Sequence, residues 1–136
     1  MLIGLHRDDT KRDCEWMVNK ILKLALFDQP DTGRRWAASV ATRELEILCV
    51  SQFTLYSTLK GNKPDFHLAM GPNESRALYE HFLTRLRDQY QPDRIRDGQF
   101  GAMMEVNIVN DGPVTINLES PTSLKNPQPP LTKDSE

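Results

Sequence analysis

The sequence is poor in the residues that build disulfide frameworks, metal sites and membrane spans. Only two cysteines, Cys14 and Cys49, occur in 136 residues, and neither lies in a C-x-x-C or Cys/His ligand spacing. No run of 18 apolar residues is present, and charges fall within the first ten residues, so neither a membrane span nor a secretory signal is predicted. We therefore expect a soluble cytoplasmic protein with no metal and no cofactor.

A strong charge of one sign is also lacking. Lys and Arg number 17 against 19 Asp and Glu, which gives a formal net charge of -2. A protein that wraps a long nucleic-acid backbone is usually strongly basic, so this charge argues against such binding. A small contact with one end of an RNA is still compatible with it. The length suits a single domain, which we place at residues 1–120. The tail 121–136 holds four prolines without apolar periodicity, and it is predicted to be disordered.

Apolar periodicity predicts alternating strands and helices in the first half. "MLIGL" is typical of a short buried strand, and the spacing of apolar residues from Thr10 to about Leu24 predicts a helix, with Asp9 or Thr10 as its N-cap. "WAASV" is predicted to be a short strand, and "LEILCVSQF" from Leu45 is a stronger prediction because it is rich in strand-forming residues.

The second half is predicted to contain a long loop, a helix and a hairpin. The polar segment from Tyr56 to Pro72 fits a loop of the length that is often functional. A helix capped by Asn73 and ended by Pro92 is expected next. Alternating apolar residues then predict half-buried strands at 102–108 and 114–118, joined by N-D-G with a proline directly after the turn.

No known catalytic pattern emerges from spacing alone. His6, His67 and His81 have no partner pattern, and we expect His81 at the surface. A triad of Ser51, His67 and Asp111 is disfavoured because no G-x-S-x-G sequence frames the serine. Glycine-rich phosphate loops are absent.

Two short stretches remain as candidates. In "SQFTL" a strand ends in hydroxyls, an amide and an aromatic ring, which either satisfy loop backbone or form a site where Phe53 stacks on a base and polar groups stabilise an oxyanion. Spacing favours the first interpretation. In "LKGNKPDFH", Lys60 and Lys63 lie near Phe66, and these lysines are either simply solvated or in contact with phosphate.

Taken together, four motifs resemble the D-aminoacyl-tRNA deacylases. They are "SQFTL", the K-G-x-x-P-x-F loop, "FGAMMEV" at 100–106 and "NDGPVT" at 110–115, in this order. The loop "LKGNKPDFHLAM" is most similar to the animal cytosolic members. The resemblance implies an α/β fold of mixed β-sheets with two helices packed on one side, in three layers (β/β/α). It also implies a homodimer that hydrolyses the ester of D-aminoacyl-tRNA, and of glycine mischarged on tRNA-Ala, at the acceptor end of the tRNA.

The resemblance assigns roles to individual residues. The implied catalytic residues are Gln52, Thr54 and Ser51. Gln52 and Thr54 would line the scissile carbonyl, with their backbone amides as candidate oxyanion donors, and the substrate's own 2'-hydroxyl would help to activate water. The implied substrate-binding residues are Phe53, Lys60, Lys63, Phe66, Met104, Gly112 and Pro113. The Gly112-Pro113 peptide would be cis, although only about 5–6 % of X-Pro bonds in folded proteins are, and its carbonyl oxygens would exclude L side chains from the partner subunit's site.

In one respect the sequence departs from the family pattern. Members normally place a strand and a hairpin, with an arginine that helps to hold the Gly-Pro loop, ahead of the segment matching "MLIGL". The resemblance therefore implies an N-terminally truncated fold, with exposed strand edges. An inactive truncated isoform is one alternative to the enzyme. A non-enzymatic protein bound to DNA and associated with replication is the other, although the tail offers no basic arm.

Overall fold

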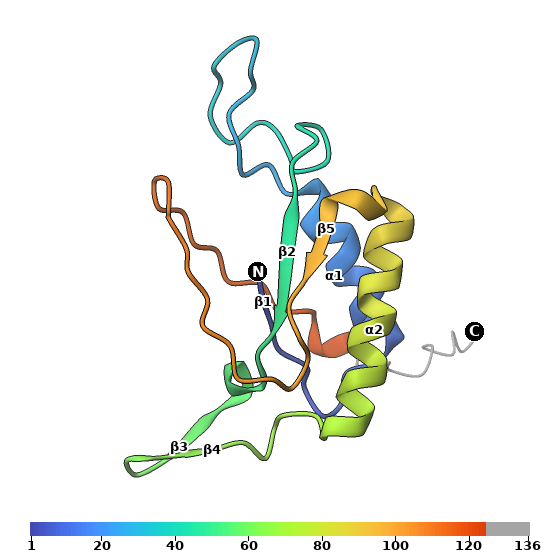
Figure 1. The fold of residues 1–136 in the computed structure, drawn as a ribbon, viewed down its shortest axis with the longest axis vertical. Coiled ribbons are helices and arrows are strands. Elements are labelled where there is room, and N and C mark those ends of the chain that lie inside the picture. The colour runs from blue at the N-terminus through green and yellow to red at the C-terminus, as the bar shows by residue number, and fades with distance from the viewer. Residues whose placement is uncertain (125–136) are drawn as a thin grey trace, which may run out of the picture.

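Two helices pack side by side on one face of a three-stranded parallel sheet (Figure 1). The computed structural model describes residues 1–124. The sheet has the order β1-β2-β5, formed by Leu2–Ile3, Ile47–Ser51 and Ile95–Asp97, and both pairings are parallel. A separate antiparallel pair, β3 (Thr58–Lys60) and β4 (Lys63–Asp65), lies beyond one end of the sheet. The predicted α/β class, with mixed sheets and two helices on one side, is confirmed.

Helix α1 (Lys11–Lys23) begins where the sequence predicts. Thr10 is the N-cap: its side chain accepts a hydrogen bond from the Arg12 amide, and the Asp13 carboxylate accepts one from the Thr10 amide at 2.9 Å. This reciprocal capping box satisfies amides that the first helical turn leaves without partners. The face with Cys14 and Val18 is buried against α2.

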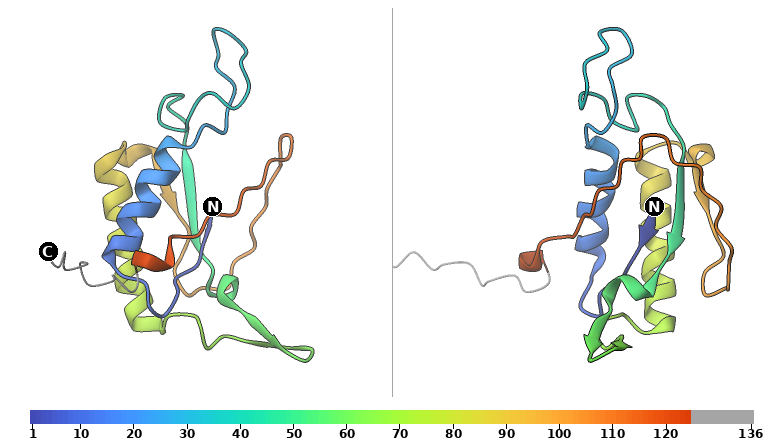
Figure 2. Two further views of the ribbon diagram at one scale, coloured as in Figure 1. Left: turned by 180° about the vertical axis from the view of Figure 1, so that it is seen from behind. Right: turned by 90° about the vertical axis from the view of Figure 1, so that its left-hand side faces the viewer.

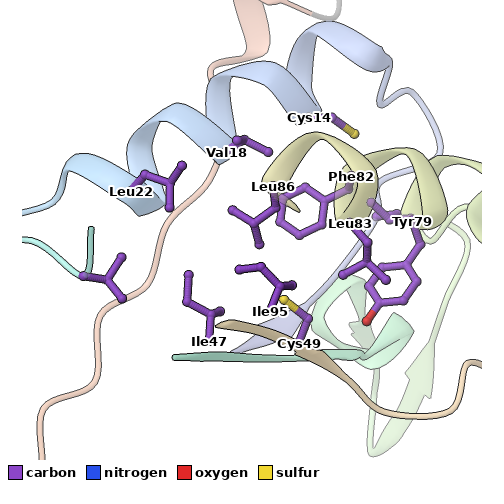
Figure 3. Close-up of a cluster of buried hydrophobic side chains, with 12 residues drawn as sticks. Cys14, Val18, Leu22, Ile47, Cys49, Tyr79, Phe82, Leu83, Leu86 and Ile95 are labelled. Atoms are coloured by element: carbon purple, nitrogen blue, oxygen red, sulfur yellow. The ribbon is translucent and has the colours of Figure 1, made fainter. Parts of the chain in front are cut away.

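Helix α2 (Pro72–Gln89) starts earlier than predicted. Its N-cap is Gly71 and not Asn73, because Pro72 occupies the first helical position. Proline fits this position since its φ is that of a helix and it has no N–H group that would lack an acceptor. The helix buries four side chains in the core, which Figure 3 shows between the helices and the sheet: Tyr79, Phe82, Leu83 and Leu86. Opposite them lie the strand residues Ile47, Cys49 and Ile95.

Four short features differ from the predictions. The segment 56–72, predicted as a loop, contains the β3–β4 hairpin, and β5 was not predicted at all. "WAASV" is not a strand: only Ala38 forms an isolated bridge, with Phe27, and the positive φ of 52° at Trp36 interrupts the extended backbone. Of the predicted "MLIGL" strand, only Leu2–Ile3 pairs.

Residues 102–119, here called the arm, do not form the two predicted strands. They are extended without a neighbouring strand, and every residue from 105 to 119 is exposed. The first part of the arm lies on the side of the sheet away from the helices, and its second part runs back past β1 to α1 (Figures 1 and 2). Apolar alternation gives a segment one apolar face, but a strand exists only where another backbone supplies hydrogen bonds, and no segment among residues 1–124 does so here.

After the arm, the described chain ends in a single 3-10 turn, η3 (Thr122–Leu124), close to α1 (Figure 2). The predicted disorder of the tail concerns mainly residues 125–136, which lie outside the described residues. Among residues 1–124, neither helix is long and apolar enough to cross a membrane.

Candidate active site

The candidate catalytic residues lie where β2 leaves the sheet. Ser51, the last residue of β2, pairs with Ile3, and the Gln52 amide donates to the Ile3 carbonyl at 2.8 Å. The chain then turns into the short 3-10 helix η1 (Phe53–Tyr56), which lies against Gly4, the residue directly after β1. This approach requires a glycine, since a Cβ at Gly4 would lie 2.8 Å from the Cβ of Leu55. Backbone contacts with β1 therefore fix the start of "SQFTL".

Gln52 and Thr54 form a polar pair at this turn. The Gln52 Nε2 donates a hydrogen bond to the Thr54 Oγ1 at 2.7 Å. Accepting this bond leaves the hydroxyl hydrogen of Thr54 available to a substrate oxygen. A carbonyl beside this pair would meet a hydroxyl donor already held in place, which is the arrangement needed to stabilise a developing oxyanion.

Phe53 and Phe66 form an aromatic surface beside the polar pair. Their ring centroids are 5.0 Å apart with an interplanar angle of 69°, an edge-to-face contact. Phe53 is 58% exposed and Phe66 38% exposed, so neither ring belongs to the core. An exposed aromatic face of this kind can stack on any base of a single-stranded nucleic acid end.

The β3–β4 hairpin carries the two candidate lysines. Its two-residue turn uses Gly61, at a φ of 62°, and places Lys60 directly opposite Lys63. Lys60 forms a 3.2 Å ion pair with Asp65, while Lys63 has no acidic partner among the described residues. The hairpin thus joins two exposed cations to the aromatic pair, because Phe66 directly follows β4.

Asp65 and His67 form a close pair that sequence reasoning missed. The His67 Nδ1 contacts the Asp65 carboxylate, whose pKa falls from 3.8 to about 2, mainly because of hydrogen bonds from His67 and then because of Lys60. The His67 carbonyl accepts a 3.5 Å hydrogen bond from Arg7, a second basic group beside the hairpin. The D-x-H spacing in the sequence was the available signal, whereas the disfavoured triad would pair His67 with Asp111.

The disfavoured triad is not assembled in the described chain. The partner of His67 is Asp65 and not Asp111. Among residues 1–124, the Ser51 side chain forms no hydrogen bond with His67 or with either of these aspartates. His81, predicted at the surface, is half-buried, with its Nε2 3.8 Å from a Glu15 oxygen.

The two cysteines are unsuited to nucleophilic catalysis. Both are free and buried, and burial raises the pKa of Cys14 to about 12 and that of Cys49 to about 11, so both are protonated at neutral pH. No group of three metal-ligating side chains is found in the part of the chain that the structure describes.

The remaining candidate residues belong to the arm, which follows β5. Met104, near the start of the arm, accepts a 3.3 Å hydrogen bond on its Sδ from the Gln99 amide. Gly112, with a φ of 122°, and Pro113 form the far turn of the arm, and the peptide bond between them is cis, as the resemblance implies. Both views show this turn, orange to red, well away from η1 (Figures 1 and 2). One chain therefore does not bring its own Gly112-Pro113 to its own "SQFTL".

Comparison with known proteins places these features in a family. A family model described as "D-Tyr-tRNA(Tyr) deacylase" matches residues 1–119. The chain is 54% identical over 121 residues to D-aminoacyl-tRNA deacylase 1 of Mus musculus, covering 89% of this chain and 57% of that protein. It is 56% identical to the D-aminoacyl-tRNA deacylase of Drosophila melanogaster, covering 89% of this chain and 75% of that protein. The chain thus spans little more than half the length of the mouse relative.

Two solved structures resemble the fold. One, described as "c-Myc DNA Unwinding Element Binding Protein", has a TM-score of 0.84 and 54% identity, covering 88% of this chain and 80% of that one. The other, a "probable eukaryotic D-amino acid tRNA deacylase", has a TM-score of 0.63 at 20% identity, covering 75% of this chain and 74% of that one, and supports the fold alone. From the match over residues 1–119 and the identity to curated relatives, we conclude that the chain belongs to the D-Tyr-tRNA(Tyr) deacylase family.

Proposed function

We propose that this protein hydrolyses the ester bond of D-aminoacyl-tRNA. The observation that carries the proposal is the Gln52–Thr54 pair, held at 2.7 Å beside an exposed Phe53, in a chain that the family model matches over 1–119. Phe53 and Phe66 receive the terminal adenine, and Lys60 and Lys63 contact phosphates of the acceptor end.

The chemistry needs no covalent nucleophile. An aminoacyl ester is already activated, so positioning and oxyanion stabilisation suffice. Thr54 donates its hydroxyl hydrogen to the scissile carbonyl oxygen, and Gln52 holds that hydroxyl in place. Water attacks the carbonyl carbon with help from the 2'-hydroxyl of the substrate's ribose. The bond between that carbon and the 3'-oxygen then breaks, and a proton from the water passes to the 3'-oxygen, which leaves as a hydroxyl while the amino acid leaves as a carboxylic acid. Ser51, whose backbone belongs to β2, positions the turn.

Selection of the D configuration is proposed to come from a second copy. In a homodimer, the Gly112-Pro113 turn of one protomer faces the α-carbon of the substrate bound to its partner. Its carbonyl oxygens block an L side chain, admit a D side chain and leave glycine unopposed, so glycyl-tRNA-Ala is also cleaved. The separation of this turn from η1 in one chain supports action between protomers (Figure 1).

The test compares D-tyrosyl-tRNA, L-tyrosyl-tRNA and glycyl-tRNA-Ala as substrates of the purified chain. Circular dichroism confirms folding, and sedimentation gives the oligomeric state. We expect loss of the D and glycyl esters with the L ester preserved, from a dimer. A folded dimer that leaves the D ester intact contradicts the proposal. A Thr54→Val variant, equal in shape but without the hydroxyl, is the matched control for spontaneous hydrolysis.

A second candidate function rests on one comparison. The similar structure with a TM-score of 0.84 is described as a DNA unwinding element binding protein. If this chain binds duplex DNA through Lys60 and Lys63, affinity must fall steeply with salt concentration. Titration of a fluorescent duplex at two salt concentrations measures this. The formal net charge of -2 favours the tRNA end as the ligand, and the two free thiols suit the reducing cytoplasm as the place of action.

A further inference from the structure

The arm is supported mainly at its two ends. No backbone-to-backbone hydrogen bond joins residues 103–119 to the rest of residues 1–124, and residues 105–119 are all exposed. An extended segment without a hydrogen-bonded neighbour has little internal stiffness. The position of the Gly112-Pro113 turn therefore depends on how the ends of the arm are held.

At the end where the arm begins, α2 holds the chain through an aromatic ring. Phe100 packs on Tyr79, with ring centroids 5.6 Å apart, and the Arg76 guanidinium lies 4.8 Å from the centre of the Phe100 ring. Tyr79 is itself fixed by a 2.5 Å hydrogen bond from its hydroxyl to Asp97. This end is attached to the core by packing.

At the other end, one buried hydrogen bond ties the arm to α1. The Ser120 hydroxyl donates to the Asp13 Oδ1 at 2.6 Å, across 107 residues of sequence. Both residues are almost fully buried, at 7% and 4% exposure, and a hydrogen bond to a carboxylate is roughly twice as strong as one between neutral groups. The other oxygen, Oδ2, accepts from the Thr10 amide in the capping box. The Thr10 amide therefore keeps an acceptor when Ser120 is replaced.

We propose that Ser120, through Asp13, fixes the far end of the arm and so sets the position of Gly112-Pro113. Ser120 is then a positioning residue for the choice between D and L esters, an inference that rests on the proposed function. It does not touch the substrate. If the bond is lost, the turn moves away from the α-carbon, and L esters gain access while the Gln52–Thr54 pair is unchanged.

The first readout is the ratio of the hydrolysis rates of D- and L-tyrosyl-tRNA. For Ser120→Ala we expect this ratio to fall about tenfold or more, as for the loss of one hydrogen bond to a charged group. Ser39→Ala is the matched control, because Ser39 is also 7% exposed and hydrogen-bonded, to Thr42, but lies outside the arm. If Ser120 has only a structural role, Ser120→Ala should behave like Ser39→Ala and lower the rates for the D and L esters together, so that their ratio does not change. An unchanged ratio in folded Ser120→Ala overturns the proposal.

A second pair of variants separates the hydroxyl from packing. Ser120 lines a cavity of about 690 Å³ between β1, α1 and the arm, which gives room for one more methyl group. Ser120→Thr keeps the donor, whereas Ser120→Val has the same shape without it. We expect the ratio to be retained by threonine and lost with valine. Equal ratios in the two variants overturn the proposal, even if Ser120→Ala does not fold.

A third readout is independent of activity. Nitroxide labels on Val109→Cys, 99% exposed on the arm, and on Thr84→Cys, exposed on α2, report the position of the arm by electron paramagnetic resonance. Dilution with unlabelled protein restricts the signal to one chain. We expect Ser120→Val to broaden the distance distribution relative to Ser120→Thr, and an identical distribution overturns the proposal. If the unlabelled wild type cleaves no ester, the proposed function fails while this readout still decides whether Ser120 holds the arm.

Discussion

Among the glycines of the sequence, Gly4 leaves the least room for a side chain, because it lies against η1. A Cβ added at Gly4 would be 2.8 Å from the Leu55 Cβ and 3.2 Å from a ring carbon of Tyr56, whereas ordinary contacts begin at 3.4 Å. In Gly4→Ala, η1 and β1 must therefore separate by about 0.6 Å. This movement is imposed on the turn that carries Gln52 and Thr54, at the point where its backbone bonds to β1.

The size of the effect follows from that displacement. Misplacement of a reacting group by 1 Å can cost about a hundredfold in rate, so we expect kcat/KM for D-tyrosyl-tRNA to fall on the order of tenfold. Overpacking should also lower the free energy of unfolding by about 1–3 kcal/mol. Single-turnover deacylation and thermal unfolding measure the two effects separately.

Gly71→Ala is the control for this prediction. A Cβ at Gly71 meets nothing within 4 Å, and its φ of -62° suits any residue, so kcat/KM should not change. If Gly4→Ala keeps the wild-type kcat/KM, either η1 does not carry the chemistry or its position is not set by β1. The reasoning about the site would then be refuted.

Three further predictions concern the residues around η1. Phe53→Ala should raise KM for aminoacyl-tRNA by about 5- to 150-fold, because stacking on one base contributes about 1–3 kcal/mol, with little change in Tm since the ring is 58% exposed. Lys63→Gln should reduce the slope of log affinity against log salt by about 1 in binding titrations, and an unchanged slope means no phosphate contact. His67→Ala should return the carboxyl pKa of Asp65 from about 2 towards 3.8 in an NMR titration; in the wild type, the stabilisation of the hairpin is present above pH 3.8 and is lost as the pH falls towards 2.

Elements with strong local signals were predictable from the sequence. Thr10 followed three residues later by Asp13 is a capping signal, and the apolar spacing behind it defines the buried face of α1. The start of α2 was misplaced by two residues because Asn73 is a common cap, although the proline at position 72 is the stronger signal. Such elements are specified by residues within one or two turns.

Elements that depend on distant partners were not predictable. β5 has only one buried residue, Ile95, and exists because β2 lies beside it. The β3–β4 hairpin has no apolar alternation, and only the Gly61-Asn62 turn indicates it. In the arm the opposite error occurred, because alternation was present and the hydrogen-bonding neighbour was not.

The candidate site was located from family motifs and not from physical reasoning. Spacing alone favoured a structural role for "SQFTL", since nothing in the sequence shows that Gln52 reaches Thr54 or that Phe53 meets Phe66. No sequence motif predicted two other contacts, the pair of Asp65 with His67 and the hydrogen bond from Ser120 to Asp13. Motifs identified the segments, and the fold determined the partners.

The carboxylate of Asp13 makes the start of α1 and the end of the arm thermodynamically coupled. Its Oδ2 accepts from the Thr10 hydroxyl at 3.3 Å as well as from the Thr10 amide, and its Oδ1 accepts from the Ser120 hydroxyl. Rotation of the carboxylate to favour one oxygen changes the hydrogen-bond geometry at the other. In a double-mutant cycle, changes at positions 10 and 120 therefore should not add, although the two residues are 110 positions apart. A surface substitution at the helix cap can thus change the position of the Gly112-Pro113 turn, although the substituted residue makes no contact with that turn.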